Sequence, residues 1–161
     1  MQVLFKNKLT NLLGTELKVG DKFPDFKAVD NNLEDFDSKT IKGQRRLIFS
    51  IPSIDTGVCE METTKFFHYF ESKENPVVVI SQDLPFALKR WCATKESEKV
   101  KTLSEFRHHD FANKTGTMLE GIGLLARACF VVDADDTILH VEYCANTHDE
   151  PNYKEIFKFF E

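Results

Sequence analysis

The chain has 161 residues, 42% of them hydrophobic, and a formal net charge of −5. This size and composition suit one compact domain over residues 1–161 and exclude a membrane-spanning protein, because no run approaches ~20 apolar residues. The negative charge argues against a general nucleic-acid-binding protein. The first residues lack a basic region followed by an apolar block, which predicts a cytoplasmic chain without a secretion signal.

The N-terminal third predicts short extended elements. Residues 3–17 alternate weakly around Asn11 and Gly14, which predicts a short β-hairpin. An extended piece follows at 26–29, then a turn at 31–36. Residues 38–43 predict one helical turn that ends at glycine.

The middle of the chain predicts strands that alternate with helices. A buried strand is expected at 46–51, followed by a helix that contains Cys59 and runs to about Ser72. The β-branched run at 76–81 predicts a strand covered on both faces. A second helix should follow, with Asp83 as its cap and Pro85 in its first turn.

The C-terminal third predicts a strand at 100–103, a short helix at 108–114, a hairpin of strands at 127–132 and 137–143, and a helix at 151–160. Alternating strands and helices followed by an antiparallel hairpin favour an α/β fold. We expect a mixed central sheet with helices on both faces.

Four cysteines are present, and none forms a C-x-x-C pair: Cys59, Cys92, Cys129 and Cys144. The spacing argues against a zinc ribbon and against a thioredoxin-type dithiol motif. Four cysteines in a chain of this length do not form a disulfide scaffold. The number suits an intracellular protein in which one or two thiols carry out chemistry.

Cys59 is the first candidate because it lies where the 46–51 strand gives way to a helix. Unpaired backbone N–H groups and the positive end of the helix dipole meet there. A thiol in such a position ionises more easily than a free one, and the thiolate is the nucleophile. The alternative is a buried structural cysteine, because free cysteines are among the most buried residues.

Two neighbours of Cys59 fit a peroxide-reducing thiol, which needs donors for the peroxide oxygens and protection from side reactions. Thr56 precedes Cys59 by one helical turn, so its hydroxyl can reach the sulfur or a bound oxygen. Pro52 lacks an N–H and can shield the site. The alternatives are a helix N-cap for Thr56 and a simple strand terminator for Pro52.

Pro52, Thr56 and Cys59 fill the pattern Pro-x-x-x-Thr-x-x-Cys, which resembles the peroxidatic motif of the peroxiredoxins. The fuller string at 52–59 resembles one atypical 2-Cys branch, the bacterial thiol peroxidases. Five further stretches also match this branch: Asp-Leu-Pro-Phe-Ala at 83–87, Arg-Trp-Cys at 90–92, Thr-Leu-Ser at 102–104, Leu-Leu-Ala-Arg-Ala at 124–128 and Glu-Pro-Asn-Tyr at 150–153. The resemblance covers nearly the whole chain.

The resemblance implies a thioredoxin-like fold and a role in antioxidant defence by reducing hydrogen peroxide and organic hydroperoxides. Cys59 would be the peroxidatic cysteine, and Cys92 would resolve its sulfenic acid as an intramolecular disulfide. Arg127 would stabilise the thiolate, Thr56 would hold the peroxide and Pro52 would shield the pocket. A thioredoxin-type protein would reduce the disulfide. Members are usually homodimers and carry no metal or organic cofactor.

Without the resemblance, Arg127 suits a surface ion pair at a strand edge, and Cys92 suits a packed thiol beside Trp91. Cys129 lies inside an apolar strand and should be buried and inert, whereas Cys144 ends a strand and should be more exposed. Two other functions stay open: a redox sensor that passes oxidation to a partner, and a thioredoxin-fold protein without activity.

Overall fold

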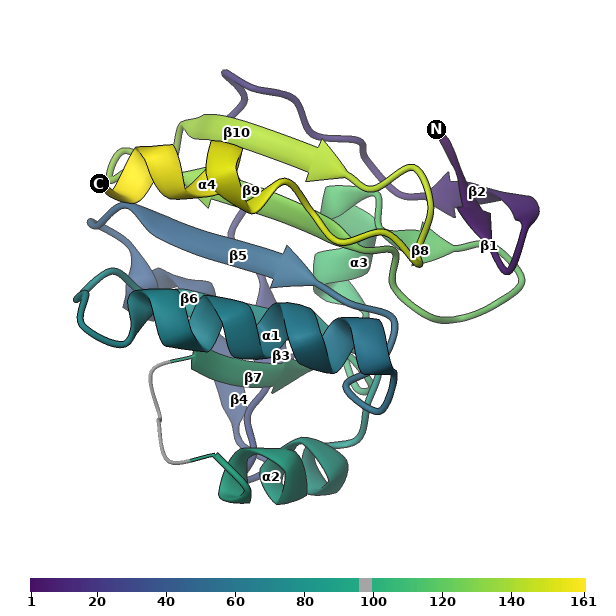
Figure 1. Cartoon of the computed structure of the whole chain (residues 1–161), viewed down its shortest axis with the longest axis horizontal. Coiled ribbons are helices and arrows are strands. Elements are labelled where there is room, and N and C mark those ends of the chain that lie inside the picture. The colour runs from purple at the N-terminus through teal and green to yellow at the C-terminus, as the bar shows by residue number, and fades with distance from the viewer. Residues whose placement is uncertain (96–99) are drawn as a thin grey trace.

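The computed structural model describes residues 1–95 and 100–161 and places a seven-stranded mixed sheet at its centre (Figure 1). The strand order is β10-β9-β5-β6-β7-β3-β4. Strands β5, β6 and β7 run parallel, and the other neighbours pair antiparallel. The strands are β3 (Lys27–Val29), β4 (Asp35–Asp37), β5 (Arg46–Ser50), β6 (Val77–Ser81), β7 (Val100–Ser104), β9 (Ala128–Val132) and β10 (Ile138–Tyr143).

Helices cover both faces of this sheet, as the sequence predicted. The helices are α1 (Gly57–Phe70), α2 (Pro85–Ala93), α3 (Asp110–Thr115) and α4 (Tyr153–Phe157), with 3-10 turns η1 (Ser38–Ile41) and η2 (Lys158–Phe160). One core packs Phe66 and Trp91 with Ile156, so α1, α2 and α4 share a face. The other core contains Phe111 of α3. β-Strand side chains alternate between the two cores because their period is two residues.

A second, three-stranded sheet holds the predicted N-terminal hairpin, with the order β1-β2-β8. Its strands are β1 (Gln2–Phe5), β2 (Lys8–Leu13) and β8 (Met118–Leu119). The turn lies at Lys6 and Asn7, both with positive φ, and not near Asn11 and Gly14. Asparagine adopts that conformation readily, which explains the early reversal. The two-residue strand β8 was not predicted.

Several helix boundaries differ from the predicted ones. Asp83 does not cap α2: the cap is Leu84, which makes no side-chain hydrogen bond. The predicted helix at 108–114 begins at Asp110, after His109 adopts a left-handed conformation with φ of 52°. The C-terminal helix is shorter than predicted and tightens into η2.

The topology positions the candidate site beyond the C-terminal ends of the central parallel strands β5 and β6. Strands β5 and β6 are parallel neighbours, with Ser50 opposite Ile80. The loop that leads to α1 and the connection that leads to α2 therefore leave the sheet side by side. Within the described residues, no helix has the length and apolar character needed to cross a membrane.

Candidate active site

Cys59 lies in the first turn of α1 and is fully buried. The helix starts here because Thr56, in an extended conformation, caps it: the Thr56 Oγ1 accepts a hydrogen bond from the Cys59 N–H at 3.3 Å. The Thr56 hydroxyl donates to the Ser53 carbonyl at 3.2 Å. The sulfur is thus held at the positive end of a helix dipole and away from bulk water.

Arg127 is brought to this cysteine by sheet pairing. It immediately precedes β9, whose first residue, Ala128, is opposite Ser50 at the end of β5. The Arg127 Nη2 lies 3.1 Å from the Cys59 Sγ and donates a hydrogen bond to it. Arg127 is only 1% exposed, so the alternative of a surface ion pair does not describe it.

The Arg127 guanidinium is fixed on three sides. Its Nε and Nη2 donate to the Thr147 carbonyl at 3.2 and 2.9 Å, and its Nη1 donates to the Glu62 carboxylate. Burial alone would lower the pKa of Arg127, but Glu62 and Cys59 outweigh burial and raise it. The group therefore stays cationic beside the sulfur, in position to donate a hydrogen bond to negative charge that develops there.

Glu62 is a site residue that the sequence predictions missed. It lies one turn after Cys59 on α1, is fully buried, and pairs with Arg127 through Oε2. Burial raises its pKa to about 7, against the opposing charge of Arg127. A signal was present: Glu62 falls within the apolar stripe of Cys59, Phe66 and Phe70, where an unpaired carboxylate would be costly.

Pro52 and Thr56 occupy different depths of the loop that precedes α1. Pro52 is buried and follows Ile51, the last residue that extends the β5 pairing. Thr56 is exposed and acts as the helix cap. Within the described residues, the Thr56 hydroxyl is hydrogen-bonded to the backbone of Ser53 and of Cys59, and not to the Cys59 sulfur.

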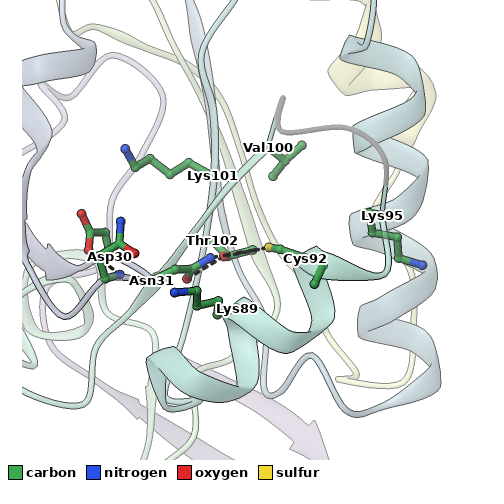
Figure 2. Close-up of a pocket in the computed structure, with 10 residues that line it drawn as sticks. Asp30, Asn31, Lys89, Cys92, Lys95, Val100, Lys101 and Thr102 are labelled. Carbon is green, nitrogen blue, oxygen red and sulfur yellow. Dashed lines mark hydrogen bonds between the residues drawn. The ribbon is translucent and has the colours of Figure 1, made fainter.

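Cys92 is near the end of α2 and is half-buried. Its Sγ lies 3.2 Å from the Thr102 Oγ1 on β7 and accepts a weak hydrogen bond from the Asn31 Nδ2 at 3.7 Å (Figure 2). These groups border an open cavity of about 500 Å³, which is also lined by Lys89 and Lys101. Cys92 is therefore partly exposed beside an open cavity, whereas Cys59 is fully buried.

The structure does not bring Cys59 and Cys92 into a disulfide, since all four cysteines are free. Each sulfur has its own partners: Arg127 for Cys59, and Thr102 with Asn31 for Cys92. A bond between the two sulfurs therefore requires both to leave their present partners. The structure represents the dithiol form.

The other two cysteines are buried. Cys129 lies in β9 as predicted, and its Sγ donates to the Glu62 Oε1 at 3.6 Å. Cys144 is only 4% exposed, so the prediction of a more exposed thiol was wrong. It follows β10 and its N–H donates to the Arg127 carbonyl, which continues the sheet pairing and covers it. Burial raises the pKa of Cys129 strongly and that of Cys144 to about 12.

Known proteins resemble this chain over almost its whole length. Residues 18–157 match the family model described as Redoxin. The thiol peroxidase of Oceanobacillus iheyensis is 44% identical over 155 residues, which cover 96% of this chain and 94% of that protein. The thiol peroxidase of Staphylococcus haemolyticus is 41% identical over 152 residues, covering 94% and 93%.

Solved structures are also similar to this chain over almost its whole length. A peroxiredoxin-like protein from Aquifex aeolicus superposes with a TM-score of 0.91 at 36% identity, covering 98% of this chain and 94% of that one. A thiol peroxidase from Chromobacterium violaceum superposes with a TM-score of 0.89 and covers 99% and 94%, but at 22% identity this likeness shows the fold alone.

Proposed function

The chain belongs to the thiol peroxidases of the Redoxin family, and from that premise we propose how its own residues reduce a hydroperoxide. The activity is thiol-dependent peroxide reduction. The observation that carries the proposal is the 3.1 Å contact between the Arg127 Nη2 and the buried Cys59 Sγ. No other cysteine in the described residues has a guanidinium hydrogen-bonded to its sulfur.

In the first step, the Cys59 thiolate attacks one oxygen of the hydroperoxide. An S–O bond forms, the O–O bond breaks, and the leaving alkoxide or hydroxide takes up a proton. Cys59 is oxidised to a sulfenic acid and the peroxide is reduced to an alcohol or water. Arg127 stabilises the thiolate beforehand and donates to the oxygen on which negative charge develops.

Thr56 and Pro52 complete the proposed site. The Thr56 hydroxyl is exposed and its bond to the Ser53 carbonyl is long, at 3.2 Å, so it can turn to a peroxide oxygen at low cost. Pro52 is buried and carries no N–H. We assign it the role of excluding water from one side of the sulfur.

Resolution needs the second thiol. The Cys92 sulfur attacks the sulfur of the Cys59 sulfenic acid, and an S–S bond forms as the S–O bond breaks. The displaced hydroxide takes up the proton of the Cys92 thiol and leaves as water. A dithiol reductant of the thioredoxin type then restores both thiols by exchange. The half-buried position of Cys92 beside an open cavity supports an approach of the reductant from that side. We also infer a homodimer, which rests on the family resemblance.

Steady consumption of NADPH with hydroperoxide, thioredoxin and thioredoxin reductase tests this function. The wild type should turn over continuously, Cys59→Ser should not, and the control Cys144→Ala should keep its turnover. Turnover by Cys59→Ser would refute the mechanism. A wild type that is oxidised once but never recycled would identify a redox sensor instead.

A further inference from the structure

Asp83, which was expected to cap α2, instead binds the loop that precedes α1. Its carboxylate accepts hydrogen bonds from the Ser53 Oγ at 2.7 Å and from the Ile54 N–H at 2.8 Å, both in the loop that precedes α1. It also accepts one from the Ser81 Oγ at the end of β6, at 2.8 Å. A carboxylate with three donors holds them more strongly than a neutral acceptor would.

The backbone around Asp83 is held as firmly as its side chain. The Asp83 N–H donates to the Ser81 Oγ at 3.3 Å, and the Ser104 Oγ on β7 donates to the Asp83 carbonyl at 2.6 Å. Ser81 and Ser104 are both buried. Asp83 is thus anchored to the ends of two strands, two residues before the first residue of α2, Pro85.

From Asp83, a short chain of contacts leads to the reactive sulfur. Asp83 holds Ser53, the carbonyl of Ser53 accepts from both the N–H and the hydroxyl of Thr56, and Thr56 caps the helix at Cys59. Asp83 is therefore connected through Ser53 and Thr56 to the first turn of α1. A displacement of that turn would reduce rates strongly, because the reacting atoms must be held in line.

We propose that Asp83 is a positioning residue that fixes the Cys59 loop to the root of the Cys92 helix and must release that loop when the disulfide forms. This inference rests on the proposed function. With the Asp83 bonds made, Cys59 is in place to meet a peroxide and is kept from Cys92. With them broken, the Cys59 loop and α2 move independently and the sulfurs can meet.

The other end of α2 provides a natural probe. Trp91 is the only tryptophan of the chain and neighbours Cys92. Trp91 is 9% exposed, and its ring packs on Phe67 of α1 at 5.6 Å between centroids. The Lys95 Nζ lies 4.9 Å from the centroid of the Trp91 ring. Movement of Cys92 toward Cys59 must disturb this packing, so tryptophan fluorescence reports the event.

The test is stopped-flow fluorescence of the reduced full-length protein mixed with hydrogen peroxide. A phase whose rate depends on peroxide concentration reports Cys59 oxidation, and a phase whose rate does not reports disulfide formation. Asp83→Asn keeps the size of the side chain but replaces one acceptor with a donor. We expect it to slow the first phase about tenfold or more and to speed the second severalfold.

Ser53→Ala removes one hydrogen bond to Asp83. It should slow the first phase and speed the second, each by less than Asp83→Asn does. Combined with Asp83→Asn it should add little, because both act through one contact. The control Glu74→Gln removes one negative charge from the exposed loop after α1 and should leave both phases unchanged. Thermal melts establish that each variant is folded.

Opposite changes in the two phases would support the proposal, since a merely structural residue would slow both. Equal slowing, or phases like those of the wild type, would overturn it. A wild type that shows no peroxide-dependent phase would instead refute the proposed function, so the two failures are distinct.

Discussion

The Arg127 Nη2 lies 3.1 Å from the Cys59 Sγ, while the Nη1 of the same guanidinium pairs with the buried Glu62. One planar group therefore joins a nucleophile to a carboxylate, with the Thr147 carbonyl holding its remaining edge. Lysine offers a single ammonium and cannot make these contacts at once.

We predict that Arg127→Lys lowers kcat/KM for hydroperoxide on the order of 10²-fold, the usual effect of losing one stabilising donor. The matched control is Arg46→Lys. Arg46 is also a buried arginine, 3% exposed, paired with Asp136 at 2.6 Å, but it begins β5, at the opposite end from the Cys59 loop. Both variants should lose stability, and only Arg127→Lys should lose activity. Equal activities in steady-state assays would contradict the role of Arg127.

Cys92→Ser should allow one round of peroxide reduction and then stop. Cys59 can still form a sulfenic acid, but without Cys92 no intramolecular disulfide forms for the reductant to open. The measurement is peroxide consumed per protein, with and without thioredoxin and its reductase. Recycling at the wild-type rate would remove Cys92 from the mechanism.

The oxidised protein should be no more stable than the reduced one. On chain entropy alone, a disulfide that closes the loop between Cys59 and Cys92 would raise the free energy of unfolding by roughly 4 kcal/mol. Here the bond must withdraw Cys59 from Arg127 and Cys92 from Thr102, and both cysteines lie in helices. We expect the strain to offset the entropy gain. A melting temperature of the reduced form several degrees below that of the oxidised form would argue against this expectation.

Glu105 should make stability depend on pH. It is fully buried and accepts from the Phe111 and Ala112 N–H groups at the start of α3. Burial raises its pKa from 4.5 to about 7, against these two bonds. In the folded state the Glu105 carboxyl therefore keeps its proton over a pH range in which the same carboxyl is ionised in the unfolded state.

Between about pH 4.5 and 7, the free energy of unfolding of the wild type should therefore fall relative to Glu105→Gln as pH rises, and level off above. The full change is up to about 3.5 kcal/mol, at about 1.4 kcal/mol per unit of pKa. Denaturant unfolding at several pH values measures it. A difference between the two proteins that stays constant across this range would show that burial of Glu105 does not shift its ionisation.

Much of the fold was predictable because its signals are local. The β-branched run at 76–81 and the apolar run at 46–51 became β6 and β5. The turn of the N-terminal hairpin was misplaced because Lys6 and Asn7 adopt positive φ without a glycine. Strand β8 has two residues, paired with β2 and far from it in sequence, so no periodicity marks it.

The site was predictable in parts. Cys59, Thr56 and Pro52 are close in sequence, so one motif singles them out together as candidates. Glu62 lies on α1, and its partner, Arg127, lies just before β9 and 65 residues later in the chain. The pair was missed because only the fold brings these two residues together. Asp83 was misassigned for a similar reason: a capping residue and a residue that bonds to a neighbouring loop look alike in sequence.

The central claim is that Cys59 is the thiol that peroxide oxidises. The most direct measurement treats reduced Cys92→Ser with one equivalent of hydroperoxide, traps the sulfenic acid with dimedone, and locates the label by mass spectrometry. The account predicts the label on Cys59, whose sulfur accepts a hydrogen bond from Arg127. Cys129 and Cys144 should stay unlabelled, because each has a carboxylate beside its sulfur instead and burial raises the pKa of both thiols. A label on either of those two, with Cys59 unmodified, would contradict it.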